Sequence, residues 1–179
     1  LAGYTLAREL RKLDARVQLT ILSRDEGSFY SKPMLSNALA SAKTAAQIAS
    51  ASAEQMATQL NARIVTAAEV EAIDTTRRIL HTGGKTIRYA KLVLALGADP
   101  IALPLEGDAA HEVMQINDLA AYARFREAIL GKKTVALLGA GLIGCEFAND
   151  LLAAGYGVHL IDPAARPLGR LLPEAAAEQ

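Results

Sequence analysis

The chain has 179 residues, of which 51% are hydrophobic, and its 19 basic and 19 acidic residues give a net charge of zero. This length holds one large domain or parts of two, and the balanced charge leaves no electrostatic footprint for nucleic acid or an anionic membrane. No apolar run approaches the roughly 20 residues of a membrane span. The single cysteine, Cys145, excludes a disulfide framework, a redox-active cysteine pair and a multi-cysteine zinc site within this sequence. No signal peptide is visible, so we expect a cytoplasmic protein.

The first third of the chain predicts a helix, a strand, a loop and a second helical stretch. Apolar residues recur at helical spacing over residues 1–13. The segment VQLTIL, residues 17–22, is typical of a strand in a mostly buried parallel sheet. Glycine, serine and proline mark residues 23–40 as a loop, and the alanine-rich residues 44–60 predict helix.

Short strands dominate the middle of the chain. The turn TGGK at residues 82–85 separates two of them. We interpret KLVLALGADP, residues 91–100, as a buried strand ended by Gly97 and Pro100. Asp118 is a candidate N-cap for a helix that ends at Gly131.

A strand, a glycine turn, a helix and another strand then follow in order. The segment GAGLIG has the G-x-G-x-x-G spacing, and it follows the strand TVALL (residues 134–138) and opens a helix that runs to about residue 154. The three glycines permit a tight turn, close approach of the backbone to a pyrophosphate, and close packing of helix on strand. They are Gly139, Gly141 and Gly144.

Asp162 closes the next strand, residues 158–161, about where an acidic group would bind a ribose 2′-hydroxyl. A carboxylate there would repel a 2′-phosphate, so NADH is favoured over NADPH. The alternative interpretation of the whole segment is a strand–helix–strand turn that binds no nucleotide.

The opening of the chain repeats this pattern in part. When Gly3 is set on Gly144, the apolar positions of the two segments coincide through both the helix and the following strand. The matching acid would be Asp25, with Arg24 beside it. The first copy has no strand and no first two glycines, and the second lacks further strands, so we expect a piece cut at both ends. Two dinucleotide folds suggest FAD and NAD; a duplication with one dead site is the alternative.

Four segments carry a resemblance to a known family: YSKPMLS (residues 30–36), LVLALGADP, INDLAAYARFR and GLIGCEFANDL. Together they resemble the pyridine nucleotide–disulfide oxidoreductase superfamily over essentially the whole chain, and within it the rubredoxin–NAD reductases most of all. The related flavorubredoxin reductases carry a similar Lys-Pro loop, so that branch stays open.

The resemblance implies an α/β chain with two nested Rossmann-like dinucleotide-binding folds, both incomplete. Residues 1–102 would be FAD-binding and residues 103–179 the first part of an NAD-binding domain. It implies FAD contacts along the first copy and the Lys-Pro loop, at Gly3, Arg24, Asp25, Lys32, Pro33, Val70 and Gly97. It places Glu146 near the isoalloxazine ring. The glycine motif and the acid after it predict NAD contacts at Gly139, Gly141, Gly144 and Asp162, and no ligand spacing in the sequence predicts a metal site.

Lys32 and Glu146 are the candidate catalytic pair. A lysine near the flavin N5–O4 edge would stabilise the negative charge that reduction places on the ring. A desolvated lysine needs a carboxylate partner to keep its charge, and Glu146 would supply it. The alternatives are a solvated loop lysine and a first-turn glutamate facing the helix dipole.

The resemblance implies electron transfer from NADH through FAD to rubredoxin, with no role for nucleic acid or membranes. Asn37 stands where related ferredoxin reductases often have a second lysine, and residues 1–102 contain no cysteine for disulfide reduction. The alternatives are a flavorubredoxin or ferredoxin reductase, an NADH oxidase, or an inactive fragment with no complete cofactor site. We expect these 179 residues alone to bind FAD poorly.

Overall fold

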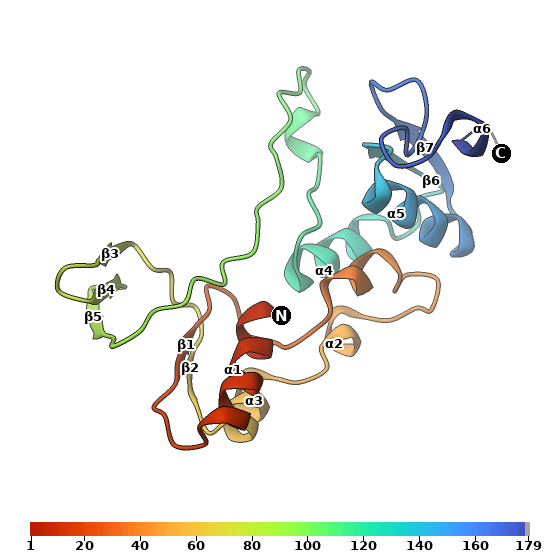
Figure 1. The fold of residues 1–179 in the computed structure, drawn as a ribbon. Helices are drawn as coiled ribbons and strands as arrows, with labels where there is room; N and C mark the ends of the chain where they lie inside the picture. The colour runs from red at the N-terminus through yellow and green to blue at the C-terminus, as the bar shows by residue number, and fades with distance from the viewer. Residues whose placement is uncertain (178–179) are drawn as a thin grey trace. The chain divides into compact units, whose positions relative to one another are not determined.

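The computed structural model describes residues 1–177, which divide into two compact units. Unit 1 comprises Leu1–Tyr30 and Ala49–Asp99, and unit 2 comprises Ser31–Ile48 and the chain from Pro100 onward. Figure 1 traces the chain from its red N-terminus to its blue C-terminal part. The sequence interpretation places Ser31–Ile48 in the first domain. The structure groups this segment with the second unit because its apolar residues and backbone donors are buried against helices there.

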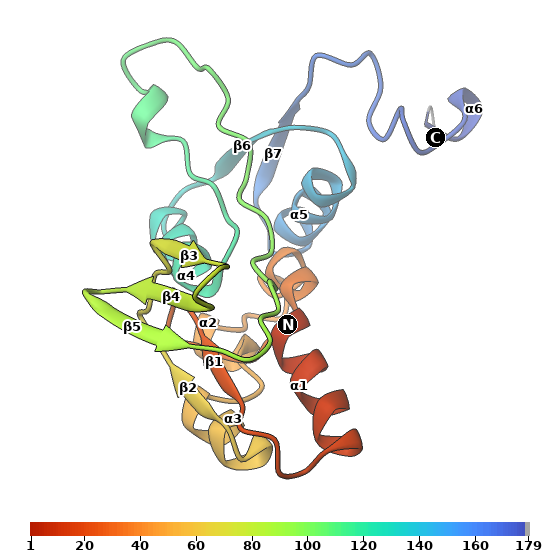
Figure 2. The same ribbon diagram turned by 60° about the vertical axis from the view of Figure 1, so that its left-hand side comes forward.

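Unit 1 is built on a pair of short parallel strands. Helix α1 (Ala2–Leu13) leads to β1 (Thr20–Leu22), and α3 (Ala53–Leu60) leads to β2 (Arg63–Val65). The strands pair in parallel with Ile21 opposite Ile64. Both helices pack beside this pair (Figure 2), and the core they share consists of Tyr4, Ala7, Ala51, Met56 and Leu60. The helix predicted for residues 1–13 is confirmed by α1, whereas the strand predicted for residues 17–22 is only three residues long.

The helical stretch predicted for residues 44–60 is interrupted. Helix α2 (Ala45–Ile48) ends before a bridge between Phe29 and Ala51, in which the Phe29 N–H donates to the Ala51 carbonyl at 2.8 Å. Ser52 then starts α3 with a reciprocal capping box, in which its hydroxyl accepts from the Gln55 N–H. The bridge and the cap satisfy backbone groups that a continuous helix would otherwise bond internally.

A three-stranded antiparallel sheet completes unit 1. It consists of β3 (Ala72–Asp74), β4 (Ile79–Thr82) and β5 (Lys85–Arg88), with β4 in the centre. Gly83 and Gly84 both have positive φ in the turn between β4 and β5, which confirms the turn predicted at residues 82–85. Figure 2 shows the three strands as one small sheet.

The buried strand predicted for residues 91–100 is wrong for this structure. This segment forms no strand, and Val93, Leu94 and Leu96 are 58%, 60% and 78% exposed. A parallel strand becomes regular and buried only when neighbouring strands bond its edges and helices cover its faces. Among residues 1–177, no strand pairs with this segment.

Unit 2 contains a two-stranded parallel sheet with a helix between its strands. Strands β6 (Thr134–Leu138) and β7 (Gly157–Ile161) pair in parallel, with Thr134 opposite Gly157 and Leu138 opposite Ile161. Asp118 caps α4 by accepting the Ala121 N–H at 2.7 Å, as predicted. In chain order, the elements of unit 2 are η1 (Lys32–Ser36), α2, η2 (Ala110–Glu112), α4 (Leu119–Ala128), β6 (Thr134–Leu138), α5 (Leu142–Ala153), β7 (Gly157–Ile161) and α6 (Glu174–Ala177).

None of the helices formed by residues 1–177 combines the length and the apolar character needed to cross a membrane.

Candidate nucleotide-binding site

The turn between β6 and α5 depends on two of its glycines. Gly139 has φ +110°, a conformation that L side chains rarely adopt, and its N–H donates to the Ile161 carbonyl at 2.8 Å. A Cβ atom on Gly144 would overlap the Gly139 carbonyl oxygen and lie 3.0 Å from its carbonyl carbon. These two positions therefore let α5 begin directly against the end of β6.

Gly141 has a different role. It is the N-cap of α5, has an ordinary φ of −77°, and a Cβ there would meet no atom within 4 Å. No side chain caps the helix, so its first N–H groups are without the partner that capping would give them. An open backbone surface before uncapped N–H groups suits a pyrophosphate. The residues present thus fit a dinucleotide.

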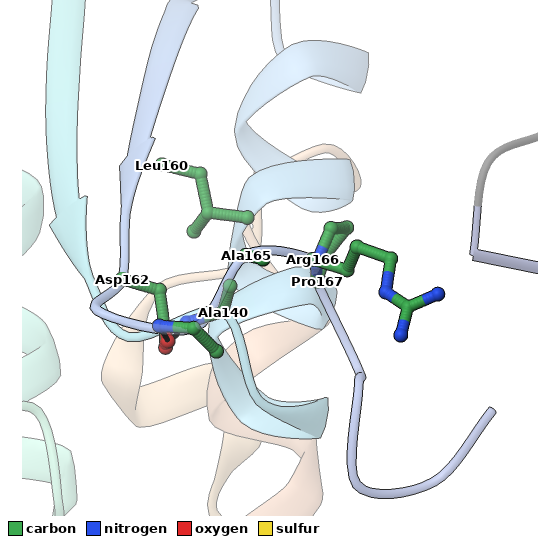
Figure 3. Close-up of a pocket in the computed structure, with 7 residues that line it drawn as sticks. Ala140, Leu160, Asp162, Ala165, Arg166 and Pro167 are labelled. Carbon is green, nitrogen blue, oxygen red and sulfur yellow. Dashed lines mark hydrogen bonds between the residues drawn. The ribbon is translucent and has the colours of Figure 1, made fainter. Parts of the chain in front are cut away.

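Asp162, directly after β7, is bonded to this same turn. Its Oδ2 accepts the Ala140 N–H at 2.6 Å, and Figure 3 shows these two residues side by side. Its Oδ1 accepts the Ala164 N–H at 2.7 Å. The bond from Ala140, followed by the bond from Ala164, holds the pKa of Asp162 below its ordinary value. Each oxygen keeps a second lone pair, so the carboxylate is able to clamp the turn and still accept a ribose hydroxyl.

An open pocket of about 270 Å³ lies beside Asp162. It is formed by the glycine turn, the end of β7 and the loop that follows (Figure 3), and it lies at the carboxyl ends of two parallel strands. Ligands of open α/β sheets bind at this edge. Its lining residues are Ala140, Leu160, Asp162, Ala164, Ala165, Arg166 and Pro167.

The Lys-Pro loop of unit 2 reaches α5 through a serine. Ser36 is 3% exposed, and its Oγ donates to Glu146 Oε2 at 2.7 Å. Lys32 is exposed at the first position of η1, and no ion pair among the described residues joins it to Glu146. The predicted Lys32–Glu146 pair is thus not formed here, because the buried end of η1 faces α5. Pro33 occupies the second, exposed position of η1.

Asp150 is a site residue that the sequence interpretation missed. It is 5% exposed, and its carboxylate accepts the backbone N–H groups of Leu39 at 2.7 Å and Ala40 at 3.0 Å. The sequence does contain a signal for it. Asp150 follows Glu146 by four residues in a largely apolar helix, so both carboxylates lie on one face.

Two candidate residues of unit 1, Arg24 and Asp25, lie just after strand β1. Arg24 pairs with Asp99 at 2.5 Å, and Asp25 Oδ1 accepts the Gly27 N–H at 2.9 Å. A Cβ on Gly3 would lie 3.6 Å from that of Ala95, an ordinary contact.

Two further candidates lie on extended segments of unit 1. Gly97 has φ +71°, and a Cβ atom on it would meet no other atom within 4 Å. Val70 is half-buried in the segment before β3. Within residues 1–177, no cluster of histidine, cysteine, aspartate or glutamate is suited to a metal ion.

The whole chain, residues 1–179, matches the family model described as pyridine nucleotide-disulphide oxidoreductase. The chain belongs to this family. In its glycine turn the third glycine packs on the first. Such a turn is typical of a site that binds a pyridine dinucleotide, in agreement with the family name.

The chain is similar to several reductases over nearly its whole length. A rubredoxin-NAD(+) reductase of Alcanivorax borkumensis is 49% identical over 99% of this chain and 47% of its own length. A nitric oxide reductase FlRd-NAD(+) reductase of Vibrio vulnificus is 36% identical over 98% of this chain and 46% of its own. A ferredoxin reductase from Rhodopseudomonas palustris has a TM-score of 0.86 at 25% identity, covering 99% of this chain and 44% of that one. The chain thus spans about half the length of the relatives it matches.

Proposed function

We propose that the protein is an NADH-dependent flavoprotein reductase that passes electrons through FAD to rubredoxin. The main support for binding of a pyridine nucleotide is the close contact of Gly144 with Gly139 at the start of α5. The name of the 49% identical relative supports rubredoxin as the acceptor. When bound, the flavin would supply the conversion of a two-electron donation into single electrons, and the protein would supply binding and electrostatics.

The residues of unit 2 would have distinct roles at the nucleotide. The backbone at Gly141 and the N-terminus of α5 would hold the pyrophosphate. Asp162, which is ionised at neutral pH because its pKa is lowered, would accept a ribose hydroxyl and disfavour a 2′-phosphate. Lys32, exposed on η1, would place a positive charge beside the flavin ring.

The FAD contacts of unit 1 would lie along its parallel strands. We propose contacts from Gly3 at the pyrophosphate, Arg24 and Asp25 at the adenosine ribose, and Val70 and Gly97 along the nucleotide. Strands β1 and β2 run in parallel, so the segments after them leave from the same edge, where such ligands bind. In unit 2, Pro33 would lie along the flavin. Glu146, which accepts a hydrogen bond from Ser36, would also lie near the flavin.

A reductase for another carrier is the second candidate. The Vibrio vulnificus relative supports a flavorubredoxin acceptor, and the solved ferredoxin reductase keeps a ferredoxin acceptor open. An NADH oxidase that uses oxygen is a further alternative. Asn37, exposed and bonded to the Pro33 carbonyl at 3.1 Å, places no charge next to the loop, which favours rubredoxin over ferredoxin.

The test is anaerobic titration of the complete, FAD-loaded protein with NADH. We expect the flavin absorbance to bleach, with NADPH far less effective, and rubredoxin to be reduced faster than ferredoxin. No bleaching with either nucleotide would overturn the proposal. If oxygen is then admitted and reoxidises the flavin rapidly while neither carrier does so under anaerobic conditions, the oxidase is favoured. Gel filtration of residues 1–179 with FAD tests the fragment alternative; retained yellow colour would contradict the expected weak binding.

We propose the cytoplasm as the location, since the proposed reaction draws on NADH. Activity that follows a cytoplasmic marker during cell fractionation would support it, and activity in another fraction would contradict it.

A further inference from the structure

The helix that would bind the pyridine nucleotide also holds the Lys-Pro loop. Helix α5 begins at the glycine turn, and the carboxylates of Glu146 and Asp150 follow on one of its faces. Glu146 accepts from Ser36, and Asp150 accepts from Leu39 and Ala40. All of these residues belong to unit 2.

We infer that Asp150 is a positioning residue: it fixes the Lys32–Pro33 loop relative to the glycine turn, so that α5 sets the spacing between the flavin and the pyridine nucleotide. This inference rests on the proposed function. Gly141 and Asp150 are nine residues apart on one helix, which at 1.5 Å per residue is a rigid length of about 14 Å.

The burial of Asp150 explains why it holds the backbone so firmly. A carboxylate that is 5% exposed costs free energy unless hydrogen bonds satisfy it. Its two oxygens each accept one backbone N–H, from Leu39 and from Ala40. Such charge-assisted bonds are about twice as strong as neutral ones. The chain leaving η1 is therefore attached to α5 at two consecutive peptide groups.

Apolar burial supports the same attachment. Leu35, Ala38 and Leu39 are 3%, 0% and 9% exposed, so the loop packs its apolar residues inward while Lys32 and Pro33 stay exposed. The loop thus has one fixed side and one side open to a ligand.

Helix α4 holds the far end of the segment. The Tyr122 hydroxyl donates to the Lys43 carbonyl at 3.1 Å, and the Arg126 guanidinium donates to the same oxygen. These bonds fix residue 43, whose own N–H donates to the Ala38 carbonyl at 2.9 Å. The portion between Ser36 and Ala40 is held by Glu146 and Asp150, and of these two carboxylates Asp150 is the one that bonds its backbone.

The variant Asp150→Asn tests the inference. An asparagine offers one acceptor oxygen, and its NH2 group would face a backbone N–H, so one bond is lost and two donors are opposed. The control is Asp118→Asn, also a carboxylate that accepts a backbone N–H in unit 2. Asparagine is an equally good N-cap there, so the control should behave like the parent protein.

The first readout needs no cofactor. Amide hydrogen exchange of the FAD-free complete protein should be about tenfold or more faster at Leu39 and Ala40 in Asp150→Asn. Peptides covering the paired strands β6 and β7 should be unchanged, which shows that the rest of unit 2 is intact. Unchanged exchange at Leu39 and Ala40 would overturn the inference.

The second readout is the rate of flavin reduction at saturating NADH in the FAD-loaded complete protein. We expect it to fall by about ten- to a hundredfold, as a displacement on the order of 1 Å would cause. The NADH dissociation constant should change by less than about twofold, because the glycine turn is untouched. Faster exchange with an unchanged reduction rate would also overturn the inference.

A third variant covers the case in which Asp150→Asn does not fold. Asp150→Glu keeps the charge and moves it by one methylene, so it should show a smaller change in both readouts; parental values in both would overturn the inference. If the parent protein shows no reduction by NADH, the proposed function fails and the kinetic part of the inference fails with it. The exchange result would still decide whether Asp150 holds the loop.

Discussion

Gly144 packs against the carbonyl group of Gly139 so closely that a methyl group on Gly144 would overlap the carbonyl oxygen. A Cβ atom on Gly141, between them, would meet no atom within 4 Å. Gly144 and Gly141 therefore lack a side chain for different physical reasons. Replacing each with alanine should affect stability and nucleotide binding differently.

We expect Gly144→Ala to destabilise the protein by about 1–3 kcal/mol, the usual cost of overpacking. Urea denaturation measures this change. Gly141→Ala should cost less, no more than about 1 kcal/mol, which is the difference between glycine and alanine at an N-cap. It should still weaken NADH binding by isothermal titration calorimetry, because a methyl group would obstruct the pyrophosphate. Equal stability losses in both variants would show that open space at Gly141 is not the relevant difference.

Asp162 should make the stability depend on pH. Its folded pKa is lowered by the Ala140 and Ala164 N–H groups, so the carboxylate contributes stability above its ordinary pKa of 3.8. That contribution is lost as the pH falls through the lowered folded pKa. The melting temperature of the parent protein should thus exceed that of Asp162→Asn at pH 7, and the gap should narrow below about pH 4. A gap that is constant with pH would contradict this assignment.

The same variant should change the choice of nucleotide. Asp162→Asn removes the charge that would repel a 2′-phosphate, so the ratio of kcat/KM for NADH over NADPH should fall about tenfold, as the loss of roughly one charge interaction implies. Steady-state kinetics of the FAD-loaded complete protein measure the ratio. An unchanged ratio would mean that Asp162 clamps the turn without contacting the ribose.

Tyr4 and Tyr122 form a matched pair for stability. The Tyr4 hydroxyl donates to the Gly27 carbonyl at 2.6 Å in a buried site, so Tyr4→Phe leaves that oxygen unsatisfied, at a cost of about 1–3 kcal/mol. Tyr122→Phe should cost less, because Arg126 still donates to the Lys43 carbonyl. Thermal unfolding compares the two, and a larger loss in Tyr122→Phe would refute this reasoning.

The parts that the sequence predicts well are those with local signals. The strand, glycine turn and helix from Thr134 to Ala153 form close to their predicted bounds, since their apolar pattern, required glycines and helix spacing all lie within a short window. The cap at Asp118 is confirmed for the same reason.

The parts that the sequence does not reveal depend on distant neighbours. Residues 91–100 have the pattern of a buried strand because they are apolar, yet burial needs partner strands that the local pattern does not report. The attachment of Ser36 and Leu39 to α5 spans 110 and 111 residues, beyond any local signal. The family resemblance points to Glu146, but it does not reveal Ser36 as its partner.

Unit 2 is discontinuous in sequence, and this affects how the protein is made. At a synthesis rate of about 5–20 residues per second, the 111 residues between Leu39 and Asp150 take roughly 5–20 seconds to emerge. During that interval Leu35, Ala38 and Leu39 have no helix α5 to cover them. The nascent chain thus displays an apolar segment for seconds, and we expect slowed translation to lengthen the time during which residues 31–48 are open to a chaperone or to aggregation.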